Sequence, residues 1–370
     1  MTIEHGRELR TRVTAAGELE LSLVDVPVPR PGPDQVLIRI EAAQINASDL
    51  ALLLGPADLA TLRKSGDVTT ATIPEARRGA VAGRVDQSMP VGNEGAGTVI
   101  EAGANAQALV GKRVALAGGS MFAEYKVAKV HECLVLPDGT SARDGASSVV
   151  NPLTALGFVE TMKREGHTAI VHTAAASNLG QMLVRVCAKD GIELVNIVRS
   201  PEQVALLREL GAVHVVDSTS PTFVAELTKS LTLTKATLAF DAITGGPLAN
   251  QILVAMETAI SRGAAYSRYG SSVHKQLYCY GHLDLRPTEL TPLRYGLAWG
   301  IGGWLLTPFL MKAGLPEIMR LRARVVAELT TTFASKYTAE ITLAQALEPE
   351  TILAYSKRAT GAKYLITPQV

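Results

Sequence analysis

The stretch from Ala169 to Ser200 constrains the fold of this chain more than any other. It reads AIVHTAAASNLGQMLVRVCAKDGIELVNIVRS, in which a short apolar run leads into a cluster of small residues. Apolar residues then recur at a helical spacing, at Leu179, Leu183 and Val186, and a second apolar run covers 194–198. The pattern predicts a strand, a tight turn, a helix and a second strand, which is the repeating unit of parallel sheets.

The turn carries a reduced form of the glycine-rich fingerprint GxGxxG. Ala175, Ser177 and Gly180 occupy its three positions, so two of the three glycines are replaced. Small residues in such a turn let the backbone approach the pyrophosphate of a dinucleotide, which binds N–H groups at the start of the helix, here at Asn178 and Leu179. An ordinary strand–helix crossover with a tight turn explains the spacing equally well.

The end of the second strand bears on the choice of cofactor. NAD-binding chains usually carry an Asp or Glu about 20 residues beyond the fingerprint, for the ribose hydroxyls. This chain has Arg199 followed by Ser200. A guanidinium pairs with a 2′-phosphate, which a carboxylate would repel. We therefore predict NADP(H) as the cofactor; the alternative is that Arg199 is a solvated charge at a strand end.

Composition favours small-molecule chemistry. The net charge of +1 over 370 residues gives no electrostatic reason to expect nucleic acid or an anionic membrane as a partner. The three cysteines are far apart and suggest neither a disulfide framework nor a CxxC metal site. The first ten residues carry several charges and lack the apolar core of a signal peptide. The uncharged run 297–311 is too short for a bilayer and is interrupted by glycines. We expect a cytoplasmic protein with a small-molecule substrate.

The predicted pattern of secondary structure changes near Asn151. Before it, 19–49 and 93–137 contain short strand patterns separated by glycines and prolines, as in a small barrel. After it, strand and helix patterns alternate, which predicts a doubly wound parallel sheet. The segment KYLIT near the C-terminus reads as a strand, and we expect it to return to the first domain.

The long polar segment Gly55–Pro90 shows no clear strand period. It gathers Arg77, Arg78 and Arg84. We hypothesise a lid over the substrate mouth, with one of these arginines meeting an anionic group on the substrate; a solvated surface excursion is the alternative.

Several segments between about Leu19 and the C-terminus are characteristic in sequence and order. They are PGPDQVLIRIEAAQINASDL, VGNEGAGTVIEAG, GKRVALAGGSMFAEYKVA, NPLTALG, the cofactor stretch and SKRATGAKYLIT. In these segments the chain resembles the zinc-less medium-chain dehydrogenases/reductases, namely the quinone oxidoreductases and the mitochondrial-type enoyl thioester reductases. The resemblance implies an α/β protein with a GroES-like β-barrel domain at 1–150, completed by 335–370, and a Rossmann NADP-binding domain with a doubly wound parallel sheet at 151–334. Family members are commonly dimers or tetramers, and we expect a homodimer.

Zinc-dependent members hold their catalytic metal through a Cys and a His, and here those positions are Asn46 in NASD and Asn93 in GNE. Amides are poor zinc ligands beside thiolate and imidazole, so we expect no metal. The resemblance places both residues beside the nicotinamide and the substrate. Each could donate a hydrogen bond to a developing oxyanion, although a buried Asn also often satisfies backbone groups.

The resemblance implies further cofactor contacts. These are Asn151 and Thr154 at the nicotinamide riboside; the backbone of Tyr280, Gly281 and His282 at the carboxamide; Arg358, reaching back to the cofactor; and Gln203, where quinone oxidoreductases usually have a lysine for the 2′-phosphate.

Without a Lewis acid, electron-poor substrates remain accessible to hydride transfer. We therefore expect an NADPH-dependent, zinc-independent oxidoreductase of quinones or α,β-unsaturated carbonyl compounds. An enoyl thioester reductase is the alternative, although those enzymes use a tyrosine soon after the NxSD motif and none occurs between Asp49 and Asn93. An alternative from another class is a structural or sensory NADPH-binding protein with little turnover. No proton donor is assigned.

Overall fold

The computed structural model describes residues 3–357 and 363–369. The chain divides into two compact units, 1–150 with 324–370, and 151–323. The return to the first unit begins inside helix α9 (Leu315–Ala327), eleven residues before the boundary we expected at 335. A helical pattern carries no signal for a boundary between its own turns, so the sequence could not locate this one.

The first unit is built from two sheets. One has the order β4-β5-β2-β1-β6, and the other has the order β10-β8-β7-β3-β20-β19 with β9 also paired to β3. Its strands are β1 (His5–Val13), β2 (Glu18–Pro27), β3 (Gln35–Gln44), β4 (Arg63–Ser65), β5 (Val68–Thr72), β6 (Met89–Pro90), β7 (Glu94–Ala102), β8 (Arg113–Ala117), β9 (Tyr125–Lys129), β10 (Leu134–Val135), β19 (Ala339–Ile341) and β20 (Tyr364–Ile366). Its α-helices are α1 (Ala47–Leu53), α2 (Ala142–Gly145) and α10 (Pro349–Ser356), and its 3-10 helices are η1 (Leu59–Thr61), η2 (Glu75–Arg84), η3 (Gln107–Leu109), η4 (Val130–Glu132) and η6 (Gln345–Leu347).

The segment 55–90 contains three strands that the sequence did not indicate, β4, β5 and β6. β5 pairs antiparallel with β2, Val68 opposite Ser22 and Thr72 opposite Glu18, and β4 pairs with β5. The buried positions of β5 are occupied by Thr69 and Ala71. Because these residues are small or polar, the alternation of the strand was not visible as a hydrophobic period.

Two of the three arginines considered for the lid bind backbone carbonyls of the same unit. Arg84 Nη1 donates to the Leu52 carbonyl at 2.7 Å, and Arg78 Nε donates to the Ile73 carbonyl at 3.3 Å. Arg77 is exposed. The segment is thus a continuation of the sheet, and the lid remains a hypothesis that would rest on Arg77.

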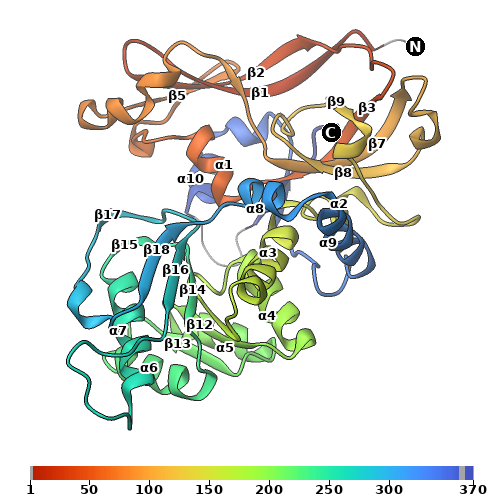
Figure 1. Ribbon diagram of the computed structural model, residues 1–370. Helices are drawn as coiled ribbons and strands as arrows, with labels where there is room; N and C mark the ends of the chain where they lie inside the picture. The colour runs from red at the N-terminus through yellow and green to blue at the C-terminus, as the bar shows by residue number, and fades with distance from the viewer. Residues whose placement is uncertain (1–2, 358–362, 370) are drawn as a thin grey trace. The chain divides into compact units, whose positions relative to one another are not determined.

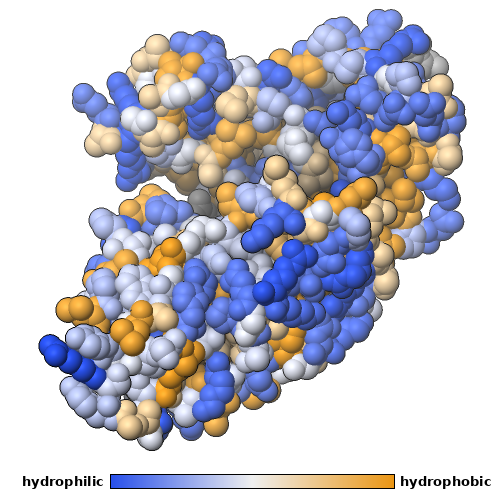
Figure 2. All heavy atoms as spheres, in the orientation of Figure 1, coloured by the Kyte–Doolittle hydropathy of each residue, from blue (hydrophilic) through white to orange (hydrophobic). Residues whose placement is uncertain are grey.

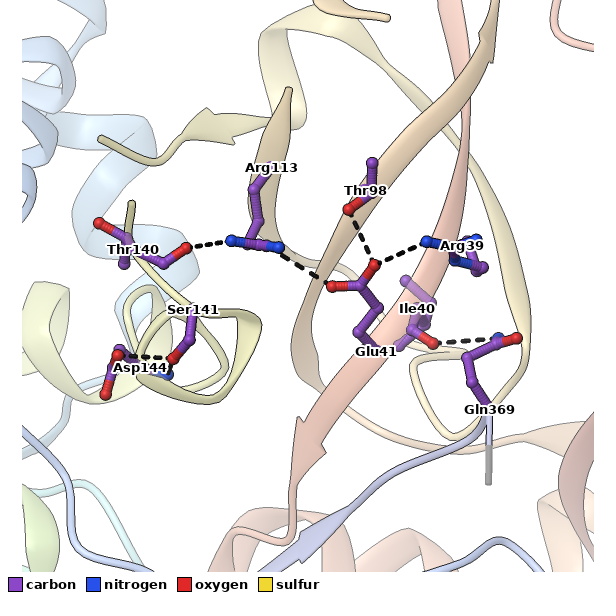
Figure 3. A network of polar contacts seen from close by, with 9 residues as sticks. All are labelled: Arg39, Ile40, Glu41, Thr98, Arg113, Thr140, Ser141, Asp144 and Gln369. Carbon is purple, nitrogen blue, oxygen red and sulfur yellow. Dashed lines mark hydrogen bonds and ion pairs between the residues drawn. The ribbon is translucent and has the colours of Figure 1, made fainter. Parts of the chain in front are cut away.

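The C-terminal segment is joined to β3. β20 pairs antiparallel with β3, Leu365 opposite Gln44. Beyond it, Gln369 Nε2 donates to the carbonyl of Ile40 at 3.1 Å (Figure 3). It also donates to the carbonyl of Glu124 at 2.8 Å. The last strand of the chain therefore completes a sheet begun more than 300 residues earlier.

The second unit holds a six-stranded parallel sheet in the order β13-β12-β11-β14-β16-β18. Helices α6 and α7 pack together on one face, and α4 and α5 lie on the other (Figure 1). The doubly wound α/β class is confirmed. The strands are β11 (Ala169–His172), β12 (Glu193–Val198), β13 (His214–Asp217), β14 (Leu238–Asp241), β15 (Thr244–Gly246), β16 (Lys275–Cys279), β17 (Asp284–Thr288) and β18 (Trp299–Gly303), and the helices are α3 (Val150–Arg164), α4 (Asn178–Asp190), α5 (Pro201–Glu209), α6 (Phe223–Thr234), α7 (Leu248–Ser261), η5 (Pro292–Arg294), α8 (Leu306–Ala313) and α9.

A buried ion pair joins α7 to the start of β16. Lys275, which has no exposed surface, donates from Nζ to Glu257 Oε2 at 2.6 Å. Ser271 donates to the same carboxylate from both its N–H and its hydroxyl, at 2.7 and 2.6 Å. Burial alone would raise the pKa of Glu257, but the hydrogen bonds from Lys275 and Ser271 outweigh it and hold that pKa at about 2. The pair fixes the connection between α7 and β16.

We predict that Lys275→Met lowers the free energy of unfolding by about 3–5 kcal/mol, because it leaves a buried carboxylate without its cation. Urea unfolding followed by tryptophan fluorescence would measure this in the right unit, since both tryptophans, Trp299 and Trp304, belong to it. Lys312→Met, at an exposed position of α8, is the matched control and should change little. Equal effects of the two substitutions would contradict the prediction.

Candidate functional site

The turn between β11 and α4 has the geometry of a close backbone approach. Ala174 adopts a φ of +50°, a left-handed conformation that costs a non-glycine residue free energy. Ser177 is the N-cap of α4, and its Oγ accepts from the Gly180 N–H at 3.2 Å. Ala175 is fully buried. The turn thus points the N–H groups at the start of a 13-residue helix toward the carboxyl edge of the sheet, an arrangement that binds anions.

Gly180 is the one fingerprint glycine that remains, and the packing requires it. A Cβ at this position would lie 2.1 Å from the carbonyl oxygen of Ala175. No side chain fits at that distance, because the first turn of α4 rests directly on the backbone that leads into it.

We predict that Gly180→Ala destabilises the protein by about 1–3 kcal/mol through overpacking and weakens dinucleotide binding, because the turn must open to admit the methyl group. Thermal unfolding and a fluorescence titration with NADPH would measure the two effects. Gly191→Ala, at the exposed end of α4, is strained by a φ of +66° but meets no atom within 4 Å. It should lose stability without losing affinity, and loss of affinity in both variants would contradict the assignment.

At the end of β12, the predicted 2′-phosphate residues adopt a capped helix start. Ser200 is the N-cap of α5, and its Oγ accepts from the Gln203 N–H at 3.4 Å. Gln203 Oε1 in turn accepts from the Arg199 N–H at 3.0 Å. Gln203 therefore holds the backbone of Arg199, whose side chain is exposed at the same sheet edge.

Three predicted cofactor residues, Tyr280, Gly281 and His282, directly follow β16. His172 Nε2 and the Tyr280 hydroxyl lie 2.7 Å apart in a hydrogen bond, and Phe158 of α3 packs edge-on against Tyr280 with ring centroids 5.0 Å apart. Burial lowers the pKa of His172 to about 3, so this ring is neutral and structural. His282 is exposed.

Helix α3 carries Asn151 and Thr154 toward the same region. Thr154 precedes Phe158 by four residues, so the two side chains share a helix face. Asn151 lies three residues before Thr154 and is half-buried. Thr154 thus lies one helical turn before the ring that packs against Tyr280, and the nicotinamide role of the pair stays a prediction. Arg358, by contrast, lies outside the described residues.

In the first unit, one buried carboxylate holds both predicted catalytic asparagines. Asp49, 2% exposed, accepts from the Asn46 N–H on Oδ2 and from the Asn93 N–H on Oδ1, each at 2.7 Å. Asp49 stands at the third position of α1, where such a carboxylate can cap the helix that begins after Asn46. The two asparagines, 47 positions apart in the sequence, are therefore brought together by Asp49.

A second buried carboxylate orients the Asn46 side chain. Glu94, which has no exposed surface, accepts from Asn46 Nδ2 at 3.0 Å and from the side chain of Gln44 on the same oxygen. Its other oxygen accepts from the N–H groups of Val149 and Val150, at 3.0 and 2.8 Å. The Asn93 side chain likewise donates from Nδ2 to Ser48 Oγ at 2.9 Å. Both predicted asparagines thus make hydrogen bonds to other side chains of the protein.

Sequence reasoning did not select Asp49, Glu94 or Lys363, although the first two stand within NASD and GNE. Burial raises the pKa of Asp49 to about 7, against the two N–H donors that lower it. Burial lowers the pKa of Lys363 to about 7, against the attraction of Glu94 and Asp49, which raise it. The spacing of Asn46 and Asp49, which is that of an N-cap and its third helical residue, was the available signal.

The raised pKa of Asp49 predicts a pH dependence of stability. The unfolded chain releases this proton near pH 3.9, whereas the folded chain keeps it up to about pH 7. The contribution of Asp49 to the free energy of unfolding therefore falls as pH rises from about 4 to about 7. The lowered pKa of His172 has the opposite effect over the same range, because the unfolded chain binds a proton there that the folded chain does not. The fall should therefore appear in the difference in the free energy of unfolding between the wild type and Asp49→Asn, measured by urea unfolding between about pH 4.5 and 6.5.

In Asp49→Asn this falling contribution should be lost, so stability should rise more steeply with pH than in the wild type, because an amide does not titrate. Asp67→Asn, at an exposed position in the β4–β5 turn, is the control and should keep the wild-type slope. An unchanged slope in Asp49→Asn would show that another group is responsible.

Within the described part of the chain, no three His, Cys, Asp or Glu side chains lie together as a metal site, and no helix is long and apolar enough to span a membrane.

Comparison with known proteins supplies independent findings. A family model described as the alcohol dehydrogenase GroES-like domain matches residues 32–138, which include both asparagines and both carboxylates of the first unit. The mitochondrial enoyl-[acyl-carrier-protein] reductase of Xenopus tropicalis is 30% identical over 53% of this chain and 51% of its own length. A quinone oxidoreductase of Pseudomonas aeruginosa is 28% identical over 50% of this chain and 51% of its own length. The chain spans about half the length of these curated relatives.

Solved structures match over the whole chain. A candidate NADPH:quinone reductase of Mesorhizobium loti is 28% identical, with a TM-score of 0.74 and full coverage of both chains. Quinone oxidoreductase of Escherichia coli, solved in complex with NADPH, has a TM-score of 0.70 at 16% identity over 98% of this chain and all of its own, which is a likeness of fold alone.

Proposed function

The chain belongs to the quinone oxidoreductase- and enoyl reductase-like group of the medium-chain dehydrogenases/reductases, and from this premise we propose that it is an NADPH-dependent oxidoreductase. Its substrates in this proposal are quinones or α,β-unsaturated carbonyl compounds, reduced without zinc. The observation that carries the proposal is the turn before α4. Gly180 rests there on the Ala175 carbonyl, and Arg199 stands at the end of the next strand.

The residues of the second unit fit a dinucleotide with a 2′-phosphate. The N–H groups at the start of α4 would hold the pyrophosphate. Arg199, with its backbone held by Gln203, would pair with the 2′-phosphate, and the strand ends at Tyr280–His282 would bind the nicotinamide side. Asn151, Thr154 and Arg358 are proposed as further contacts to the cofactor.

NADPH, when bound, supplies a hydride from C4 of its nicotinamide. The electron pair displaced from the conjugated bond moves to the carbonyl oxygen of the substrate, where amide N–H groups of Asn46 and Asn93 would donate hydrogen bonds. Asp49 and Glu94 hold these asparagines in place. Zinc independence is supported by the donor chemistry, because amides stand where thiolate and imidazole would be needed.

We also propose a cytoplasmic homodimer. The outermost strand of the parallel sheet, β18, pairs with β16 alone among the described strands. The neighbouring segment exposes leucines to solvent, and Figure 2 shows apolar residues among polar ones where Figure 1 places β17 and β18. The exposed leucines are Leu283, Leu285, Leu290, Leu293 and Leu297.

The experiment that tests the function is NADPH consumption, with NADH in parallel, against a benzoquinone, a naphthoquinone, an enone and a crotonyl thioester. Turnover of a quinone or enone with NADPH well ahead of NADH is expected. Strong preference for the thioester would favour an enoyl thioester reductase, the activity named for the Xenopus relative. Tight NADPH binding without turnover of any compound would favour the binding protein.

We predict that Arg199→Ala lowers kcat/KM for NADPH by about 10- to 100-fold, the effect of losing a charged hydrogen-bond donor, and leaves kcat/KM for NADH nearly unchanged. Lys229→Ala, at an exposed position of α6, is the control and should leave both values unchanged. A parallel loss with NADH and NADPH would assign Arg199 a role other than 2′-phosphate recognition.

A further inference from the structure

The ladder between β14 and β16 continues one step beyond the strands and is then interrupted. Tyr280 donates its N–H to the Asp241 carbonyl at 2.9 Å, as the next rung of a parallel pair. In a parallel ladder the following rung would bring the Ile243 N–H to the Tyr280 carbonyl. Ile243 instead donates its N–H to the side chain of Asp241, at 2.8 Å to Oδ1.

The side chains of Asp241 and Thr173 together accept hydrogen bonds from three consecutive backbone N–H groups, those of residues 242–244. Thr173 Oγ1 accepts from the Ala242 N–H at 2.8 Å and donates to Asp241 Oδ1 at 2.7 Å. Asp241 Oδ2 accepts from the Thr244 N–H at 3.1 Å. The Asp241 side chain is fully buried. The N–H groups of the backbone after β14 are therefore held by a buried carboxylate and a threonine hydroxyl. Pairing with the segment after β16 resumes only at Leu283 and Asp284, whose N–H groups donate to the Ala242 and Ile243 carbonyls at 3.0 and 3.1 Å.

This arrangement leaves the Tyr280 carbonyl without a hydrogen-bond donor in the described part of the chain. Within residues 3–357 and 363–369, no backbone or side-chain group donates a hydrogen bond to it. The next carbonyl, that of Gly281, accepts from Thr244 Oγ1 at 2.6 Å. Gly281 also permits the close approach of the two chains, because a Cβ there would lie 2.8 Å from the Ala242 carbonyl oxygen. Of these two adjacent carbonyls, that of Tyr280 is the one left open.

This acceptor lies near the switch point of the sheet. β11 and β14 are neighbours where the strand order reverses, Thr173 follows β11, and Asp241 ends β14. Dinucleotides cross a doubly wound sheet at this place. A backbone carbonyl takes an N–H donor, and a nicotinamide dinucleotide has amino groups on its adenine and on its carboxamide. The adenine side would lie at β12 with Arg199, so the carboxamide is the group that remains for Tyr280.

We propose that Asp241, supported by Thr173, is a positioning residue that keeps the Tyr280 carbonyl open for the carboxamide NH₂ of the nicotinamide. The inference rests on the proposed function, because it needs a nicotinamide cofactor. It goes beyond that function in assigning the geometry of the carboxamide contact to a buried carboxylate that does not itself touch the cofactor.

Isothermal titration calorimetry with NADP⁺ and with its 3-acetylpyridine analogue tests the proposal, since the analogue has a methyl group in place of the carboxamide NH₂. Wild-type protein should bind NADP⁺ about tenfold more tightly than the analogue, the effect of one hydrogen bond. Asp241→Asn should lose this preference by weakening NADP⁺ alone, because an amide cannot accept from all three donors. Thr173→Val should reduce the preference, and Thr173→Ser should restore it.

Asp217→Asn is the matched control. Asp217 ends β13 and accepts from the N–H and the hydroxyl of Thr219, at 2.9 and 2.8 Å, in a similar turn on another strand. It should keep the wild-type preference. Equal binding of NADP⁺ and the analogue by the wild type would overturn the proposal without any variant, and so would folded Asp241→Asn and Thr173→Val proteins that keep the preference. Wild-type protein that binds neither compound would overturn the proposed function itself.

Discussion

A backbone N–H group buried at the end of a strand or the start of a helix must find an acceptor, and this chain meets that need with buried carboxylates. Asp49 accepts from the backbone of Asn46 and Asn93, and Glu94 accepts from Val149 and Val150. Asp241 does the same after β14. Loops that would otherwise vary in conformation are thereby held in single arrangements, and the proposed ligand contacts are carried by those loops.

The two units use this device in different ways. In the first, the carboxylates hold side chains that would face a substrate, and the asparagine of NASD is held through both its backbone and its amide. In the second unit, Asp241 accepts from the Ile243 N–H, which would otherwise pair with the segment after β16. The Tyr280 carbonyl is thereby left without a donor among the described residues. Substituting Asn46 or Asn93 changes the chemical group that the loop offers to a ligand. Substituting Asp49, Glu94 or Asp241 instead changes whether the loop that carries such a group is held in one conformation.

The sequence was sufficient for the α/β class, because apolar period and the small residues between Val171 and Gly180 are local signals. It also indicated the return of KYLIT to the first unit. It was insufficient for 55–90, where Thr69 and Ala71 form a buried strand face without a hydrophobic period. The partners of Asn46 and Asn93 were missed for a related reason: Asp49 and Glu94 read as ordinary polar residues until the fold buries them, and only the cap spacing of Asn46 and Asp49 hinted at it.

The hairpin of β4 and β5 changes which strand forms the border of its sheet. Without it, the border would be β2, ten residues long with leucines at alternate positions. With it, the border is β4, three residues long and carrying Arg63 and Lys64. A short border strand with positive charges is a poor template for pairing with another chain, whereas a long apolar one invites it. The β4–β5 hairpin therefore lowers the tendency of the first unit to aggregate through the edge of this sheet.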